Sequence, residues 1–499
     1  MDKSLAAQYS DSWVFRYRWL VLACFPILTF FFPTDLRYFV GLSFSGIAAF
    51  VLLLSMKRVR NERIPIYMVF GLFIIAYFIR MAVLQTNVDI FSSFVPASTI
   101  QMMMSNGVGE EVFEVTVFGF VVFCLVSSIY LSFAAPRYRI VYSYQIAPNH
   151  APRLLALAKR VFIVTAFMAV VISFVFYKTG VGVLGSTSNA HLPFHLGGLV
   201  VYAEKLAIPY GFLIVIMIAD ALQRTWLMVT ATVFLLLHAF IAGILSASRG
   251  EVIIAGLYLI VVWLMTNRLS VKRWQALLVL FAAATLLTPL TTRLRYARAA
   301  GYSLRASIDI ALNDSWKRTS NSSPYAFLYA RISGVEQLYT IVPAAGDPNL
   351  SVERVKKYLL SGRTFAMIYT EDIENENGQA ANRTACTGLG LFYFVGGYLG
   401  IVLGWILWIG ALFVGWRLVV RYVRVTTPVA LAMLSVIFFS ATMEGTLDNI
   451  SLYAALVGSI WLWETIARSL LPQPQVVITG QIQSRTMPAE AAVKKALEE

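Results

Sequence analysis

The chain has 499 residues, of which 59% are hydrophobic and only 13% are charged. Soluble globular domains carry about one quarter charged residues, so this composition excludes a soluble protein and predicts a polytopic membrane protein. Two of the three cysteines lie inside apolar runs, which excludes a disulfide framework. The formal net charge is +14, and its distribution along the chain bears on topology.

Apolar runs predict about twelve membrane-spanning helices, because a helix needs roughly 20 residues to cross the hydrocarbon core. The predicted spans are 19–33, 38–56, 64–84, 115–133, 161–177, 198–219, 225–245, 251–266, 275–291, 387–416, 428–443 and 451–467. Strands of an outer-membrane barrel would alternate apolar and polar residues in segments of about ten, and these runs do not. The predicted fold class is therefore all-α.

Short basic connections alternate with connections that are nearly free of lysine and arginine. The basic connections are 57–63, 137–160, 224, 268–273 and 417–424. Short loops rich in lysine and arginine stay in the cytoplasm. In contrast, 85–114 contains neither residue type and carries Glu110 and Glu111. This alternation predicts that both termini are cytoplasmic.

One long connection, 292–386, lies outside by this alternation although it is rich in arginine and lysine. Loops longer than about 60 residues escape the charge bias, so the topology stands. Loops of this length usually carry function or structure of their own. We therefore divide the chain into four parts: spans one to nine (1–291), the exterior loop (292–386), spans ten to twelve (387–468) and a cytoplasmic tail (469–499). We expect the exterior loop to form part of the active site.

The sequence Ser-Ala-Ser-Arg-Gly-Glu at 246–251 places Arg249 at the outer mouth of a membrane helix. An arginine there is costly unless it reaches the headgroups, pairs, or faces a polar cavity, so Arg249 is a candidate ligand for an anion. Glu251 could orient the guanidinium or accept a proton. The alternative is an ordinary helix end whose arginine extends into lipid headgroups.

Further arginines are predicted on the same side of the membrane. Arg293, Arg295 and Arg298 follow the ninth span, and Arg331 and Arg363 lie further along the exterior loop. The planar guanidinium suits bidentate recognition of phosphate or carboxylate oxygens. With Arg249, these residues predict a site for an anionic group.

Three glutamates are candidates for a general base. Glu336 ranks first, followed by Glu251 and Glu204, although a solvated carboxylate on a helix face is the alternative for Glu336. Glu204 and Lys205 lie about two turns inside the sixth span, where isolated charges are functional candidates. Pro209 either bends this span around a cavity or marks tight packing.

Other motifs are structural or absent. Gly396, Gly400 and Gly404 form a stripe that predicts close helix packing. The sequence has no phosphate-cradling glycine loop followed by Lys-Ser/Thr, no His-Glu-x-x-His and no paired Cys-x-x-Cys. It therefore predicts no metal, no cofactor and no nucleic-acid partner.

Ser248-Arg249-Gly250, Arg331 with Glu336, and the glycine-rich segment from Thr387 to Gly400 resemble the Wzy-type O-antigen and oligosaccharide repeat-unit polymerases, which are related to the O-antigen ligases. The resemblance covers 225–470. It implies a fold like that of the lipid-dependent, GT-C-like membrane glycosyltransferases, in the bacterial inner membrane.

The implied reaction is the polymerisation of undecaprenyl-diphosphate-linked oligosaccharide repeat units of an O-antigen or exopolysaccharide at the periplasmic face, without a metal or nucleotide sugar. The implied partners are this lipid-linked oligosaccharide, the lipid bilayer, a chain-length regulator and a flippase. Preorganised cations would stabilise the departing diphosphate, each donor by about 3 kcal/mol.

Three alternatives remain at this stage. The first is an O-antigen ligase, although the exterior loop lacks the histidine that the ligases carry there. The second is a transporter or flippase for an anionic lipid-linked glycan, although transporters bind near the bilayer midplane. The third is a structural membrane component whose basic loop binds anionic lipid.

Overall fold

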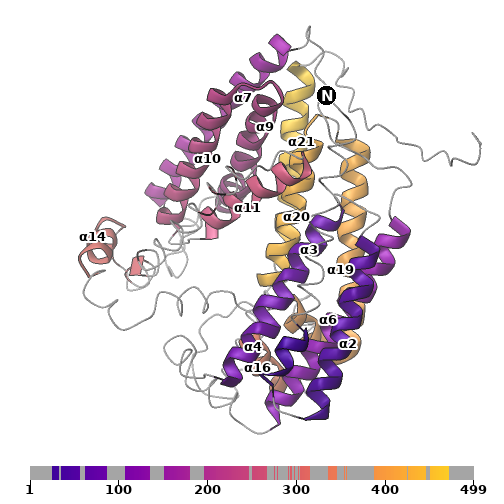
Figure 1. The fold of residues 1–499 in the computed structure, drawn as a ribbon. Helices are drawn as coiled ribbons and strands as arrows, with labels where there is room; N and C mark the ends of the chain where they lie inside the picture. Colours follow the sequence, from indigo (N-terminus) through magenta and orange to yellow (C-terminus); the bar gives the residue numbers. More distant parts are fainter. Residues whose placement is uncertain are drawn as a thin grey trace, which may run out of the picture.

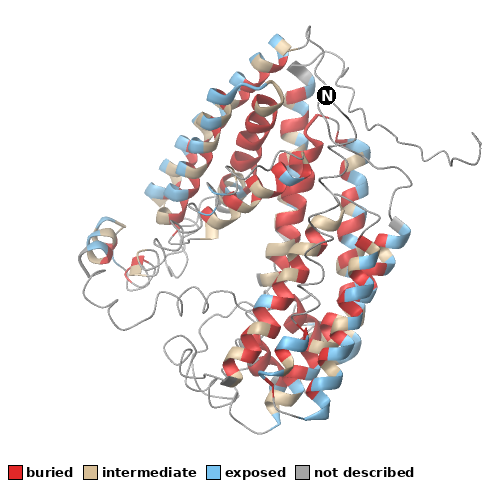
Figure 2. Cartoon of the chain, viewed as in Figure 1, coloured by how far each residue is buried: buried red, intermediate tan, exposed pale blue. Residues whose placement is uncertain are grey.

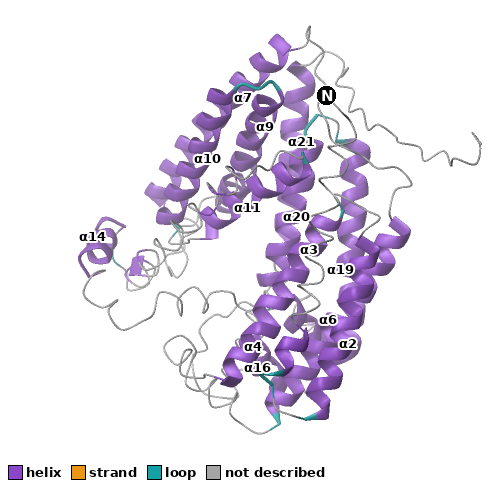
Figure 3. Ribbon diagram, viewed as in Figure 1, coloured by secondary structure: helices purple, strands orange, loops and turns teal. Residues whose placement is uncertain are grey.

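The computed structural model describes residues 25–32, 35–56, 62–86, 107–134, 151–179, 196–246, 250–266, 304–314, 335–345, 387–423, 425–444 and 450–470, together with single positions at 273, 275, 278, 290, 293, 294, 297, 302, 353 and 356. Within these residues all regular structure is helical and no strand occurs (Figure 3). The predicted all-helical fold class is confirmed for this part of the chain.

Seven segments among the described residues are long and apolar enough to cross a membrane. They are α2 (Leu36–Met56), α3–η1–α4 (Arg63–Leu72, Phe73–Ile79 and Arg80–Thr86), α6 (Val108–Ala134), α7 (Ala151–Thr179), α8–η5–α9 (Leu196–Tyr202, Ala203–Ala207 and Ile208–Ala221), α10 (Thr225–Leu245) and α19 (Gly388–Tyr422). The apolar helices α11 (Gly250–Met265) and α20 (Thr427–Glu444) are shorter, and α21 (Ile450–Leu470) follows them.

Each of these helices falls on a predicted span, so the prediction of a polytopic helical membrane protein is confirmed. The ninth predicted span and the start of the first lie outside the described residues. The total of about twelve spans and the glycosyltransferase-like arrangement therefore stay predictions.

The outer faces of the bundle are apolar, as a lipid solvent requires. Phe44 of α2, Phe167 of α7 and Leu407 of α19 are 59%, 68% and 72% exposed. In Figure 2 the exposed residues of these helices lie on one side and the buried ones face inward. Large exposed apolar surfaces mark contact with another apolar phase, which for helices of this length is the bilayer interior.

Helix α20 is the central element of the bundle. It packs against α9, α11 and α21 on one side and against α3 and α19 on the other (Figure 1). Nearly every residue from Pro428 to Phe438 is buried. A helix that is apolar on all sides belongs in the interior, and α20 therefore joins the group of α7, α9, α10 and α11 to the group of α2, α3, α6 and α19.

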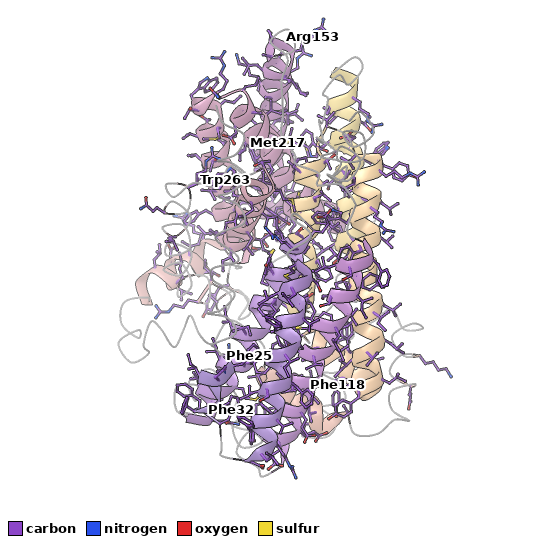
Figure 4. The ribbon with its side chains drawn as sticks, turned by 45° about the vertical axis from the view of Figure 1, so that its right-hand side comes forward. Phe25, Phe32, Phe118, Arg153, Met217 and Trp263 are labelled. Atoms are coloured by element: carbon purple, nitrogen blue, oxygen red, sulfur yellow. The ribbon has the colours of Figure 1, made fainter. Side chains whose placement is uncertain are left out.

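Labelled side chains mark the two ends of the molecule, and which end faces the cytoplasm stays a prediction. Figure 4 shows Arg153, near the start of α7, at one end of the molecule and Phe32, just before α2, near the other. The first belongs to a predicted cytoplasmic connection. The second lies close to the end of α6 that carries Glu110 and Glu111.

A break divides α19 into a short helix and a long span. Gly396 and Gly397 have non-helical backbone angles, with φ of −155° and 58°. A Cβ at Gly400 would clash with the carbonyl oxygen of Phe392, and one at Gly404 with its ring. The predicted close packing of the glycine stripe is thus confirmed for Gly400 and Gly404, and the packing partner is the preceding short helix of the same element.

The connection 292–386, which the topology predicts to be exterior, contains helices among its described residues. Helix α16 (Val335–Ala344) packs against α6 and α19 through Leu338, Ile341 and other buried residues. Helix α14 (Leu304–Asp314) forms a separate apolar cluster, in which Ile308 and Ala311 meet Leu290, Leu294 and Ile244. Because Ile244 lies at the end of α10, this cluster ties the start of the exterior loop to that helix end.

Candidate functional site

Ionisable side chains from three helices meet at the predicted outer ends of η5, α10 and α11. Glu204 and Lys205 lie in η5, His238 lies in α10, and Glu251 lies in the first turn of α11. The Nζ atom of Lys205 is 3.6 Å from Oε1 of Glu251. We refer to Glu204, Lys205, His238 and Glu251 as the carboxylate cluster.

Pro209 explains the local shape of the sixth span. Proline has no N–H, so Pro209 cannot donate the usual helical hydrogen bond to the carbonyl of Lys205, four residues earlier. The helix widens over Ala203–Ala207 into a π-turn, in which the N–H of Ile208 bonds to the carbonyl of Ala203. Trp463 of α21 donates its indole N–H to the carbonyl of Ala207 at 2.8 Å. Such turns occur frequently at functional sites, and this one sets the direction of Glu204 and Lys205.

Burial makes the charges of the cluster expensive. Glu204 is only 5% exposed, and the side chain of Glu251 is 10% exposed. The two carboxylates lie close enough to interact electrostatically with each other and with Lys205. The charged groups that act on Glu204 are Lys205, which stabilises its carboxylate, and Glu251, which repels it. Buried charges usually require stabilising partners, since desolvation costs several kcal/mol per ion.

His238 is a member of the site that the sequence analysis missed. It is 6% exposed, and its Nε2 atom has no hydrogen-bond partner in the described part of the chain. The imidazole lies near the backbone of Glu204. The sequence alone could have identified His238, because a lone histidine inside an apolar run is a functional candidate.

Arg293 is the predicted anion ligand that the structure describes best. Its Nη1 atom is buried and lacks a hydrogen-bond partner among the described residues. The adjacent Leu294 packs with Ile244 at the end of α10, the helix that leads to Gly250 and Glu251. A guanidinium nitrogen buried without an acceptor loses its hydration, which an anionic ligand would restore.

The remaining predicted ligands cannot be placed. Arg249, Arg295, Arg298, Arg331 and Arg363 lie outside the described residues. In the sequence Arg249 is separated from Glu251 by Gly250 alone.

The structure does not bring Glu336 to the carboxylate cluster. Glu336 belongs to α16, which packs against α6 and α19, and its side chain lies outside the described residues. Helix α11 packs against α9, α10 and α20 instead, and Figure 1 shows α16 and α11 far apart along the molecule. The acidic candidates that the described structure brings together are therefore Glu204 and Glu251, the two that ranked behind Glu336.

Arg80 is a second residue that the sequence analysis passed over. It begins α4, near the C-terminal end of the third predicted span, and is 2% exposed. In the sequence, Arg80 is a single cation within the apolar run 64–84. Charges inside membrane spans are rare and usually functional.

Comparisons of the chain with protein-family models, with curated proteins and with solved structures give no match. A functional interpretation therefore depends on the residues of this chain and on the site they form.

Proposed function

We propose that the chain is a membrane glycosyltransferase that polymerises undecaprenyl-diphosphate-linked oligosaccharide repeat units at the outer face of the bacterial inner membrane. The resemblance of Ser248-Arg249-Gly250 and the exterior loop to the Wzy-type polymerases suggests this reaction. The observation that carries the proposal is Arg293, whose buried Nη1 atom lacks a partner among the described residues beside the helix that leads to Arg249.

The proposed chemistry needs cations more than it needs an acid. A diphosphate leaves readily once its negative charge is stabilised, so its departure does not require protonation. Arginines held in a low-dielectric site supply that stabilisation, at about 3 kcal/mol for each well-placed donor. Arg249 and Arg293 are the first candidates, and Arg295, Arg298, Arg331 and Arg363 are further ones.

Transport of an anionic lipid-linked glycan is the second candidate function. Transporters often bind substrates at interrupted membrane helices. Interruptions among the described helices include the π-turn at Ala203–Ala207, the break at Gly396–Gly397 and the π-helix at Phe73–Ile79. The buried Glu204 in the first interruption is the specific observation that favours it.

The test uses the full-length protein in lipid vesicles with an undecaprenyl-diphosphate-linked repeat unit as the only substrate. The glycan that accumulates on the lipid carrier in cells lacking the protein identifies this substrate. Product length is then read by gel electrophoresis and mass spectrometry. Wild-type protein should give products of many repeats.

Arg249→Ala should reduce the product to single repeats, and Arg249→Lys should also impair extension if bidentate contact is needed. Arg305→Ala, at an exposed position of α14, is the matched control and should leave length unchanged. Translocation of the lipid-linked unit across sealed vesicles without extension would establish transport instead. Full-length polymer from Arg249→Ala would contradict the proposed role of this residue.

A further inference from the structure

Two buried glutamates in this protein have very different surroundings. Glu464 of α21, 6% exposed, accepts hydrogen bonds from the backbone N–H groups of Val425 and Thr426, from Thr426 Oγ1 and from Arg468 Nε, at 3.0 to 3.3 Å. Its carboxylate caps the start of α20, so its burial has a structural explanation. Glu204 is equally buried, and the charged groups that act on it are a second carboxylate, that of Glu251, and the ammonium of Lys205.

The nearby carboxylate of Glu251 makes a negative charge on the buried Glu204 still more unfavourable. Glu251 approaches η5 from α11: its carboxylate lies 3.6 Å from the ammonium of Lys205, the residue next to Glu204, and its charge acts on Glu204. Lys205 is 43% exposed and lies 3.6 Å from Glu251, which orients that carboxylate. Residues that cost stability in this way usually serve a function.

From this geometry we infer that Glu204 and Glu251 act together as the proton acceptor for glycosyl transfer, with Lys205 as the residue that positions Glu251. The inference rests on the proposed function. It gives the role of general base to this pair, whereas the sequence ranked Glu336 first for that role. A like-charged pair suits this task, because the uptake of one proton by either carboxylate removes the repulsion between them.

The step is balanced as follows. The acceptor hydroxyl oxygen forms a bond to the anomeric carbon of the donor glycan, and the bond from that carbon to the diphosphate oxygen breaks. Its electron pair leaves with undecaprenyl diphosphate, which the arginines stabilise. The hydroxyl proton passes to one carboxylate of the pair and is later released to water.

The experiment measures turnover and KM for chain extension by full-length Glu204→Gln, Glu251→Gln and the double variant in lipid vesicles. Each single variant should lower turnover by about 10²- to 10⁴-fold, the usual contribution of a general base, with little change in KM. The double variant should be about as slow as the slower single variant, because residues that act as one unit are not additive. Glu204→Asp should recover part of the turnover.

Two further variants separate catalysis from folding. Lys205→Gln keeps both carboxylates and should lower turnover by roughly tenfold, an amount typical of a lost positioning contact, while Lys205→Arg restores it. Glu110→Gln, at an exposed ion pair with Arg37, should behave as wild type.

The outcomes distinguish the two proposals. Wild-type turnover in both Glu204→Gln and Glu251→Gln overturns this inference and leaves the proposed function standing, and loss of turnover in Glu336→Gln alone would identify the base instead. Strictly additive losses in the double variant would show two independent roles. A wild-type protein that extends no glycan overturns the proposed function and this inference with it.

Discussion

At the scale of single residues, the described polar groups in the membrane interior divide into those with partners and those without. Glu464 has several donors, and Tyr210 shares a hydrogen bond of 2.7 Å with Thr426 at the same helix junction. The Nε2 atom of His238 and the Nη1 atom of Arg293 lack partners among the described residues. Satisfied groups stabilise the fold, whereas unsatisfied ones mark where a ligand is expected.

Glu464→Gln should destabilise the protein by about 2 kcal/mol, because hydrogen bonds to a buried charged group are each worth about 1.5 to 3 kcal/mol and the amide keeps only some of them. Thermal unfolding in detergent measures the change. Glu110→Gln is the comparison, since its partner Arg37 and Glu110 itself are 60% and 46% exposed. An exposed pair contributes less than about 1 kcal/mol, so equal effects would contradict the capping role.

Gly397→Ala should destabilise the protein by about 1 to 2 kcal/mol, because Gly397 has φ of 58° and a Cβ there approaches the following carbonyl oxygen. Gly396→Ala is the matched control. Its φ is −155°, and an added Cβ would meet no atom within 4 Å. If both substitutions lower the unfolding temperature equally, the left-handed backbone is not the cause.

At the scale of elements, interruptions in helices set the positions of functional groups. The π-turn of η5 directs Glu204 and Lys205, and the break in α19 folds a short helix back onto the span. Apolar periodicity predicts where a helix lies, but one additional residue in a turn rotates all later side chains relative to earlier ones. This is why Glu204 was recognised as a candidate while its pairing with Glu251 was not.

Pro209→Ala should reduce glycan extension without reducing stability. Alanine restores the N–H that can bond to the Lys205 carbonyl, so the turn can revert to α-helix and carry Glu204 away from Glu251. Pro428→Ala is the control, because a proline in the first turn of a helix lacks only an N–H that has no helical partner. Full turnover in Pro209→Ala would show that the π-turn does not position Glu204.

At the scale of the whole molecule, α20 connects the two groups of helices, and only one of them carries the carboxylate cluster. Helix α11, which holds Glu251, packs directly on α20. In the described part of the chain, the two groups of helices are therefore joined mainly by their packing against α20, which is buried and close-packed.

Ala432→Phe should destabilise the protein by about 2 to 3 kcal/mol, because overpacking forces side chains and backbone apart. Ala432 of α20 is 0% exposed. Ala454→Phe, at an exposed position of the apolar helix α21, should have little effect since the ring would extend into lipid. Similar unfolding temperatures for both variants would contradict the central position of α20.

The sequence by itself determined the fold class and the positions of the described membrane helices. It also identified Glu204, Lys205 and Glu251 as charges near the ends of apolar runs, because hydrophobic burial and charge exclusion act on local composition. Only the tertiary structure decided that Glu251 meets Glu204 and Lys205, that His238 joins them, and that Glu336 lies elsewhere. These pairings depend on how helices pack and on where their turns are interrupted, and side chains far apart in the chain carry no local signal of that packing.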